Sequence, residues 1–175
     1  MELLIFSDSH GRTEGMKEAL SRCVGKPSAT VFLGDGLRDF SSVDTGDADR
    51  YSVAGNCDLF SLFGADEEAP EERMLFLEGH TLLLTHGHRF GVKGGCGALI
   101  AYAASKGADI VLFGHTHTPF LQILPKGTVI GGAPLSRPMY LFNPGSVSYD
   151  TDGEGKSFGT LLLRRDTVLF SHGRL

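Results

Sequence analysis

The stretch ELLIFSDSHG, residues 2–11, sets a short apolar run directly before a carboxylate and an imidazole. The apolar run has the length of a β-strand and ends after Phe6. In extended backbone, residues two apart point to the same face, so Asp8 and His10 can reach one site. Gly11 permits the tight turn that the chain needs just beyond the strand. A strand that ends in polar side chains beside glycine is the pattern that decides the fold.

The same pattern occurs four more times along the chain. These runs are ATVFLGDG at residues 29–36, RYSVAGNCD at 50–58, HTLLLTHGH at 80–88 and DIVLFGHTHTP at 109–119. In open sheets that contain parallel strands, functional groups gather in a crevice beyond the carboxyl ends of the strands. We therefore expect one site that collects seven side chains: Asp8, His10, Asp35, Asn56, His86, His115 and His117.

The chemistry of these seven side chains points to transition metals. Carboxylate, amide oxygen and imidazole together are the ligands of Mn, Fe, Co, Ni or Zn. A site with four histidines is less suited to Mg or Ca, which prefer oxygen ligands. Seven ligands are too many for one tetrahedral ion, but they suit two ions that share a bridging carboxylate. Asp35 stands alone at its strand end and is the expected bridge.

Apolar spacing predicts the remaining elements. Residues 13–24 have helical spacing, and the Ala-rich residues 95–107 predict a second helix. Residues 73–88 predict an antiparallel strand pair, and the acidic run 66–72 before them predicts a solvated loop. Early βα alternation followed by a β-rich second half favours two packed sheets with helices outside. Further short strands are expected at 120–125, 128–132, 139–146, 158–165 and 167–172.

Length and composition favour a single domain over residues 1–175. The chain has a net charge of −5, which argues against an extended nucleic-acid surface. Its three cysteines form no CxxC pair, so Cys23, Cys57 and Cys96 are expected to be reduced thiols, with Cys23 and Cys96 buried in helices. Because no signal peptide or long apolar span is evident, we expect a cytoplasmic protein without a membrane segment.

In chain order, the motifs SDSHG, GDG, GNCD, THGH and GHTH resemble those of the calcineurin-like metallophosphoesterases. FNPGS at residues 142–146 extends the resemblance to small bacterial and archaeal phosphodiesterases of the YfcE type. The resemblance implies an α/β fold, a four-layer αββα sandwich of two mixed β-sheets flanked by helices. It also implies a hydrolase with two divalent metal ions.

The motifs of the family assign each ligand to one of the two ions. One ion would be held by Asp8, His10, Asp35 and His117, and the other by Asp35, Asn56, His86 and His115. Manganese is the expected ion, with Ni, Fe, Co and Zn as alternatives. A hydroxide that bridges the two ions would attack phosphorus in line. Asp35, Asn56 and His86 are the residues that we expect to be catalytic.

Cys57 stands where many relatives carry a histidine that assists the leaving group. A thiol with an ordinary pKa of about 8.5 is a poor proton donor at neutral pH. We therefore expect diesters with good leaving groups to react better than alkyl monoesters, as the YfcE-type resemblance also implies. Cys57 has no free partner base for a nucleophilic role and would be a soft metal ligand. A small neutral replacement for the histidine is the interpretation that fits best.

Several neighbouring polar residues have more than one interpretation. Asp58 could cap a turn or orient His10, and His88 could contact phosphate, contact carboxylates or only occupy the loop. Arg12 and Arg89 could pair with a substrate phosphate or be solvated.

The resulting hypothesis is a phosphodiesterase that acts on a small phosphodiester. The alternatives are a non-catalytic scaffold on the same fold and a phosphomonoesterase. The apolar C-terminal strands could contribute to a homodimer or a higher homo-oligomer. Asn143–Ser146 is expected to form a turn that supports the edge of the site, and no role is assigned to His80 or His172.

Overall fold

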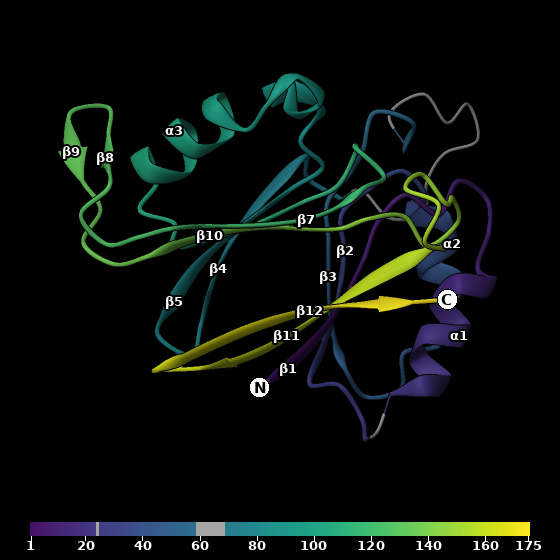
Figure 1. Ribbon diagram of the computed structural model, residues 1–175. Helices are drawn as coiled ribbons and strands as arrows, with labels where there is room; N and C mark the ends of the chain where they lie inside the picture. Colours follow the sequence, from purple (N-terminus) through teal and green to yellow (C-terminus); the bar gives the residue numbers. More distant parts are fainter. Residues whose placement is uncertain (24, 59–68) are drawn as a thin grey trace.

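The computed structural model describes residues 1–23, 25–58 and 69–175 and contains two five-stranded β-sheets (Figure 1). In order across the first sheet, the strands are β12 (Thr167–Arg174), β11 (Ser157–Arg164), β1 (Glu2–Phe6), β2 (Ala29–Phe32) and β3 (Asp49–Ser52). Across the second sheet they are β4 (Glu72–Leu77), β5 (His80–Thr85), β6 (Ile110–Phe113), β10 (Met139–Pro144) and β7 (Pro119–Leu124). A small hairpin pairs β8 (Val129–Ile130) with β9 (Ala133–Pro134).

Both sheets are mixed: the first has antiparallel strands on one side only, whereas the second has an antiparallel strand at each edge. In the first sheet β1, β2 and β3 run parallel, and in the second β5, β6 and β10 run parallel. The carboxyl ends of each parallel set therefore lie at one edge of its sheet. The motifs that follow these strands are brought together there.

Helices cover the outer faces of the two sheets. The helices α1 (Glu14–Arg22) and α2 (Leu37–Ser42) pack on the first sheet, and α3 (Gly97–Ser105) packs on the second (Figure 1). Two short 3₁₀ helices, η2 (His88–Phe90) and η3 (Val92–Gly94), lie between β5 and α3. The predicted four-layer αββα sandwich is thus confirmed.

Three apolar layers stabilise this sandwich. The central layer lies between the sheets and includes Ile5, Val31, Leu84 and Leu112, all fully buried. One outer layer packs Phe6 and other residues of the first sheet against α1 and α2, and the other packs the second sheet against α3. The strands whose two faces are both covered consist almost wholly of apolar residues, as central parallel strands do.

The structure corrects several details of the predicted elements. α2 was missed, because six residues with two buried positions give too little periodicity to recognise. The expected helix 13–24 is α1, and Val24 lies outside the described residues, as do residues 66–68 of the expected acidic loop. Residues 128–132 supply only the short strand β8. Cys23 and Cys96 are half-buried residues that flank α1 and α3, rather than buried helix residues.

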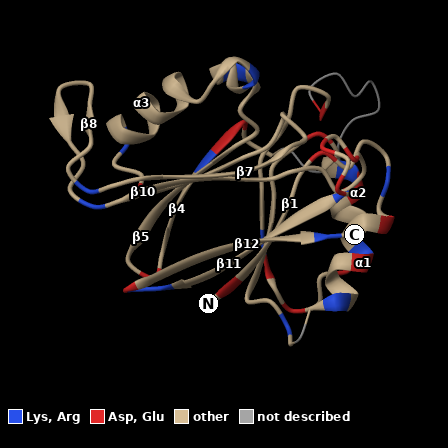
Figure 2. Cartoon of the chain, viewed as in Figure 1, with Lys and Arg blue, Asp and Glu red and all other residues tan. Residues whose placement is uncertain are grey.

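No helix in the described part of the chain is long and apolar enough to cross a membrane. Figure 2 shows Lys and Arg interspersed with Asp and Glu over the visible chain.

Candidate metal centre

The side chains of the five motifs meet in the loops beyond the strand ends. These loops hold their residues in unusual backbone conformations: Asp8, His10, Asp35, His115 and His117 all have φ between 45° and 68°. This left-handed region is uncommon for residues other than glycine, and strain of this kind concentrates at functional sites. Glu78, in the turn between β4 and β5, is the other such residue in the described chain.

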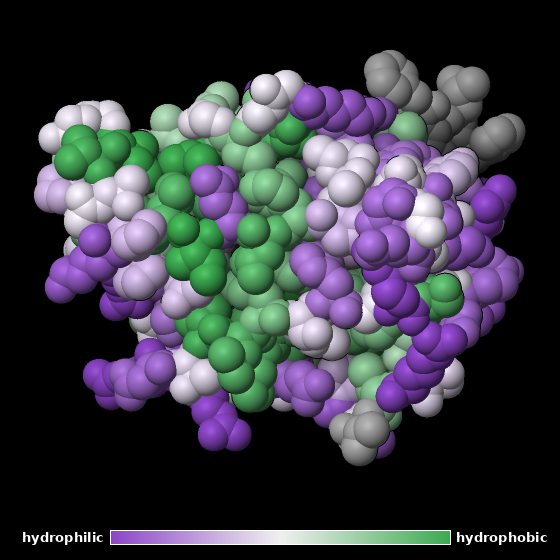
Figure 3. All heavy atoms as spheres, viewed as in Figure 1, coloured by the Kyte–Doolittle hydropathy of each residue, from purple (hydrophilic) through white to green (hydrophobic). Residues whose placement is uncertain are grey.

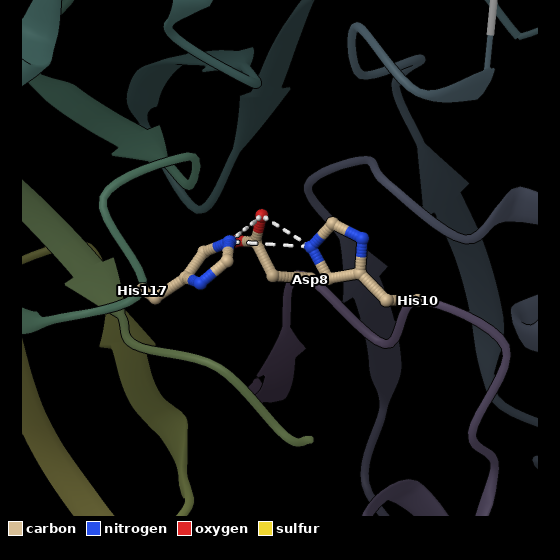
Figure 4. Close-up of side chains that lie close together, drawn as sticks. All are labelled: Asp8, His10 and His117. Atoms are coloured by element: carbon tan, nitrogen blue, oxygen red, sulfur yellow. Dashed lines mark hydrogen bonds and ion pairs between the residues drawn. The ribbon is translucent and has the colours of Figure 1, made fainter. Parts of the chain in front are cut away.

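Asp8, His10 and His117 form the first half of the centre (Figure 4). The Nε2 atoms of His10 and His117 lie 3.2 Å apart, and Asp8 Oδ1 is 3.2 Å from His117 Nε2 and 3.7 Å from His10 Nε2. Asp8 Oδ2 accepts hydrogen bonds from Ser7 Oγ and from the His115 amide, at 2.5 and 3.1 Å. Asp8 Oδ1 is therefore the oxygen left to face the two imidazoles.

Asp35, His86 and His115 form the second half of the centre. The fully buried His86 donates from Nδ1 to the carbonyl oxygen of Leu33 at 2.7 Å, which turns its Nε2 toward the site. Nε2 of His86 lies 3.4 Å from Asp35 Oδ2 and 3.2 Å from Nδ1 of His115. Asp35 Oδ2 is also 3.9 Å from His10 Nε2, so this carboxylate lies between the two halves.

Asn56 lies beside Asp35, where the backbone N–H of Cys57 donates to Asp35 Oδ1 at 2.7 Å. The side-chain oxygen of Asn56 is buried and has no hydrogen-bond partner among the described residues, and the same is true of Asp8 Oδ1. A buried oxygen without a partner is costly unless an ion or water satisfies it. The structure thus brings all seven predicted side chains to one edge of the sandwich.

The donor set and its geometry fit divalent metal ions. Three groups of ligand atoms lie within 4.8 Å of one another, namely Asp8–His10–His117, His10–Asp35–Cys57 and Asp35–His86–His115. Divalent cations would satisfy the facing nitrogens and the oxygens without described partners. Two ions, one in each half with Asp35 between them, are compatible with this arrangement.

The charges of the centre perturb the pKa values of its acids and bases. Burial alone would raise the pKa of Asp35, but hydrogen bonding and the nearby charge of His86 lower it to about 2. Burial of Asp8 is likewise outweighed by His10 and His117, which hold its pKa well below the ordinary value. Both carboxylates are therefore ionised at neutral pH and available to cations.

The histidines divide into two classes. The nearby carboxylate of Asp8 raises the pKa of His10, and Asp35 with Asp8 raises that of His86 against the effect of its burial. Burial and the neighbouring His86 lower the pKa of His115 to about 4. The carboxylates thus favour the protonated form of His10 and His86, whereas His115 favours its neutral form, and binding of cations would compete with the protons.

Asp58 holds the loops that carry Asp35 and Asn56. Its carboxylate accepts hydrogen bonds from the backbone N–H groups of Asp35, Gly36, Leu37 and Gly55 at 2.8–2.9 Å. Sequence reasoning gave two possible roles for Asp58, and these bonds match the turn-capping one. Gly55 is required here, because a Cβ at this position would lie 2.2 Å from Asp35 Oδ1.

The FNPGS segment and Ser148 hold the backbone of the first half of the centre by hydrogen bonds. Asn143 donates from Nδ2 to the Gly114 carbonyl at 2.7 Å, and Ser146 and Ser148 each donate from Oγ to the Asp8 carbonyl at 2.8 Å. Asn143 and Pro144, the first two residues of the predicted turn, are the end of β10 rather than part of a turn. The expected supporting role agrees with these contacts.

The flanking residues with open interpretations differ in their surroundings. The His88 ring lies 5.5 Å from the His86 ring and 6.1 Å from the His115 ring, and its Nδ1 is buried without a described partner. Arg89 forms an ion pair with Glu71, whereas Arg12 donates to the Ser148 carbonyl at 3.3 Å. Cys57 is exposed, and its Sγ lies close to His10 and Asp35.

Tyr149 is a neighbour of the centre that sequence reasoning missed. Its ring stacks on His117 and packs edge-on against His10. Tyr149 follows FNPGS by three residues, but no spacing rule connects it to histidines more than 30 residues away in the chain. The bonds from Ser146 and Ser148 to the Asp8 carbonyl hold the segment that carries Tyr149 next to the centre.

Large cavities occur at the other end of the second sheet, away from these residues. One of about 550 Å³ is lined by residues at the starts of β5, β6 and β10, including Thr81, Asp109 and Met139. Here Nδ1 of His80 lies 2.7 Å from Asp109 Oδ2, and Asp109 also accepts from the Thr81 amide. These bonds give His80 a structural role, as the bond between His172 Nε2 and the Asn143 carbonyl does for His172. Size alone therefore does not identify the functional site; the convergence of ligand atoms does.

Comparison with known proteins identifies relatives that are described as phosphoesterases. A family model described as the calcineurin-like phosphoesterase superfamily domain matches residues 1–166. The chain is 30% identical over 171 residues to the probable metallophosphoesterase YsnB of Bacillus subtilis, which covers 96% of this chain and 88% of that protein. It is 34% identical over 113 residues to the phosphodiesterase YfcE of Escherichia coli K12, a match that covers 63% of this chain and 50% of YfcE.

Solved structures share the fold over almost the whole chain. A predicted phosphoesterase from Streptococcus pneumoniae superimposes with a TM-score of 0.71 at 25% identity, covering 98% of this chain and 87% of that one. Wild-type Vps29 from Entamoeba histolytica, solved with zinc, gives a TM-score of 0.68 at 21% identity over 99% and 98% of the two chains. At that identity, the likeness to Vps29 concerns the fold alone.

Proposed function

The chain belongs to the calcineurin-like phosphoesterase superfamily, and from this premise we propose that it is a phosphodiesterase dependent on two divalent metal ions. The observation that carries the proposal is the convergence of six Asp and His side chains at the strand ends, together with two buried oxygens, Asp8 Oδ1 and Asn56 Oδ1, that have no hydrogen-bond partner among the described residues. We propose Asp8, His10, Asp35 and His117 as ligands of one ion, and Asp35, Asn56, His86 and His115 as ligands of the other.

The chemistry expected of such a centre is phosphoryl transfer to water. When bound, the ions would supply positive charge for the phosphoryl oxygens and lower the pKa of a coordinated water toward about 7. Manganese remains the ion that we propose, with Ni, Fe, Co and Zn as alternatives.

The residues of this chain prepare the centre for that task. The pKa values of Asp8 and Asp35 keep both carboxylates negative at neutral pH, which favours the uptake of cations. The bond from His86 Nδ1 to the Leu33 carbonyl fixes the tautomer that presents Nε2 as the free ligand atom. Asp58 holds the loops of Asp35 and Asn56 in place, so that little reorganisation is required when substrate binds.

Cys57 supports the choice of diesters over monoesters. Partial loss of solvent around the thiol and the neighbouring Asp35 raise its pKa to about 11, so the thiol is neither a nucleophile nor a useful acid at neutral pH. No described group at this position protonates a departing alkoxide. We therefore propose small phosphodiesters with good leaving groups as substrates.

A paired assay tests the proposal. Protein loaded with Mn²⁺ is assayed with bis(4-nitrophenyl) phosphate and with 4-nitrophenyl phosphate, beside a chelated sample and the variant Asp35→Asn. We expect metal-dependent turnover of the diester, a slower reaction of the monoester, and loss of turnover in the variant. Faster hydrolysis of the monoester would favour a phosphomonoesterase. Loaded protein that hydrolyses neither ester would favour a scaffold on the same fold.

A further inference from the structure

Tyr149 packs against both imidazoles of the first half of the centre. Its ring is parallel to the His117 imidazole within 4°, with the centroids 5.4 Å apart, and it meets the His10 ring at 65° and 5.3 Å. The residue nevertheless remains 41% exposed. An aromatic side chain is thus held against two predicted ligands with much of its surface open beside the centre.

Arg12 contacts the Tyr149 ring, and its guanidinium charge is not neutralised by a described carboxylate. Its guanidinium carbon lies 5.4 Å from the Tyr149 ring centroid, within the range of a cation–π contact. Within the described ranges, no carboxylate lies at ion-pair distance from Arg12. The Tyr149 ring is therefore fixed between His117, His10 and a cation that can also attract an anionic substrate.

The other flank of the centre has a different character. There His88 Nε2 lies 4.0 Å from a carboxylate oxygen of Glu71, and Glu71 pairs with Arg89. That flank presents a carboxylate beside its imidazole, whereas the Tyr149 flank presents a partly exposed aromatic ring with one guanidinium. An apolar part of a substrate has a favourable surface to contact on the Tyr149 side.

We propose that Tyr149 is a specificity-determining residue that contacts a flat aromatic ester group of the substrate. The inference rests on the proposed function and narrows the substrate class to phosphodiesters with at least one aryl group. Aromatic pairs at centroid distances of 4.5–7 Å are favourable beyond the area that they bury. A contact of this kind corresponds to roughly threefold to tenfold in affinity.

Binding of two phosphonates measures this contact without turnover. Affinities of the Mn²⁺-loaded protein for phenylphosphonate and methylphosphonate are measured by calorimetry for wild type, Tyr149→Leu and Tyr149→Phe, together with the metal content of each. We expect Tyr149→Leu to reduce the preference for phenylphosphonate roughly threefold to tenfold with unchanged metal content. Tyr149→Phe should retain the preference. Phe76→Leu replaces an exposed aromatic residue at the far end of β4 and is the matched control.

Two results would overturn the inference. One is an unchanged preference in Tyr149→Leu, and the other is equal weakening of both phosphonates with loss of metal, because Tyr149 would then act only through His117. Tyr149→Gln provides a second variant without an aromatic ring. The proposed function is tested separately: wild-type protein that prefers phenylphosphonate but hydrolyses no diester would refute the function and leave the Tyr149 contact standing.

Discussion

Asn56 and Cys57 are adjacent residues with different importance for the centre. Asn56 contributes a buried oxygen without a described partner, whereas Cys57 contributes its backbone N–H to Asp35 and leaves its thiol exposed. A backbone hydrogen bond survives replacement of the side chain. The side chain at position 57 can therefore change the reactivity of the centre without disturbing the metal ligands.

Substitution of Cys57 separates these roles. We expect Cys57→Ala to retain diester hydrolysis within about threefold, because the thiol is neutral and bonds weakly. Cys57→His should raise monoester hydrolysis, because an imidazolium can protonate a poor leaving group. The check is kcat/KM for aryl and alkyl monoesters beside a diester. A Cys57→Ala protein with full metal content and no activity would return the thiol to the chemistry.

Conservative replacement of one predicted ligand tests the centre itself. His86→Gln keeps a polar side chain of similar length but loses the Nε2 atom that faces Asp35 and His115. We expect at least one of two bound ions to be lost, and diester turnover to fall by about a hundredfold or more. Metal analysis and activity are measured together, with His80→Gln as the matched control at the opposite end of β5. Wild-type metal content in His86→Gln would contradict the ligand assignment.

At the scale of elements, the loops beyond β2 and β3 depend on one carboxylate. Asp58 accepts four backbone hydrogen bonds, and removing it leaves those N–H groups without partners in a partly buried loop. We expect Asp58→Ala to lower the free energy of unfolding by about 2–4 kcal/mol. Metal affinity should also fall, because Asp35 and Gly55 lose their anchor.

Urea denaturation and metal titration check this prediction. Asp44→Ala is the matched control, because Asp44 accepts one bond from the Gly46 N–H in an exposed turn. An Asp58→Ala protein as stable as the control would show that the loops are held by other contacts.

The strand-end pattern explains how much of the structure was predictable. Local apolar runs and their terminal polar residues predict β1, β2, β5 and β6 and place the seven side chains, because parallel strands share an edge. Asp39, which accepts from Ser9 Oγ and from the Gly11 amide, and Tyr149 carry no such local signal. Their positions depend on packing between distant segments, which periodicity does not encode.

For the whole molecule, the centre makes stability depend on pH when metal is absent. His10 and His86 have pKa values raised above the ordinary 6.5, so the stability they contribute is present below 6.5 and lost as pH rises through the raised values. His115, with a pKa lowered to about 4, has the opposite effect: it destabilises the fold at low pH, and this cost disappears as pH rises from 4 to 6.5. Asp35 loses its contribution as pH falls from about 4 toward 2.

These effects predict that the free energy of unfolding of the chelated protein is highest near pH 6.5. Unfolding free energies from urea titrations in EDTA at pH 5, 6.5 and 8 should be highest at 6.5. With saturating Mn²⁺ the decline toward pH 8 should disappear, because metal binding requires neutral imidazoles and strengthens as protons leave. Chelated protein that is more stable at pH 8 than at 6.5 would contradict the assigned directions.

The surface around the edge strands β7 and β12 is where we expect the protein to associate with itself. Figure 3 shows hydrophobic residues gathered where β7 and β12 lie in this view, and Leu121, Ile123 and Leu169 are 43, 52 and 59% exposed. Both strands are edge strands, which readily pair with another chain. We keep a homodimer or higher homo-oligomer as a proposal, for which these edges are the expected contact.

Sedimentation over a range of protein concentrations tests that proposal. We expect the wild type to associate and the double variant Leu121→Lys, Ile123→Lys to remain monomeric with unchanged metal content. Monomeric wild-type protein at high concentration would refute it.

The left-handed backbone at five of the predicted ligands has a consequence for the history of this fold. Each such residue costs of order 1–3 kcal/mol, which glycine at the same position would largely avoid. A lineage that abandoned the chemistry would therefore gain from relaxing these positions, and mutational drift would replace their aspartates and histidines with glycine or asparagine. This chain keeps the strained residues at all five. Selection for activity, acting against selection for stability, is the force we expect to maintain them.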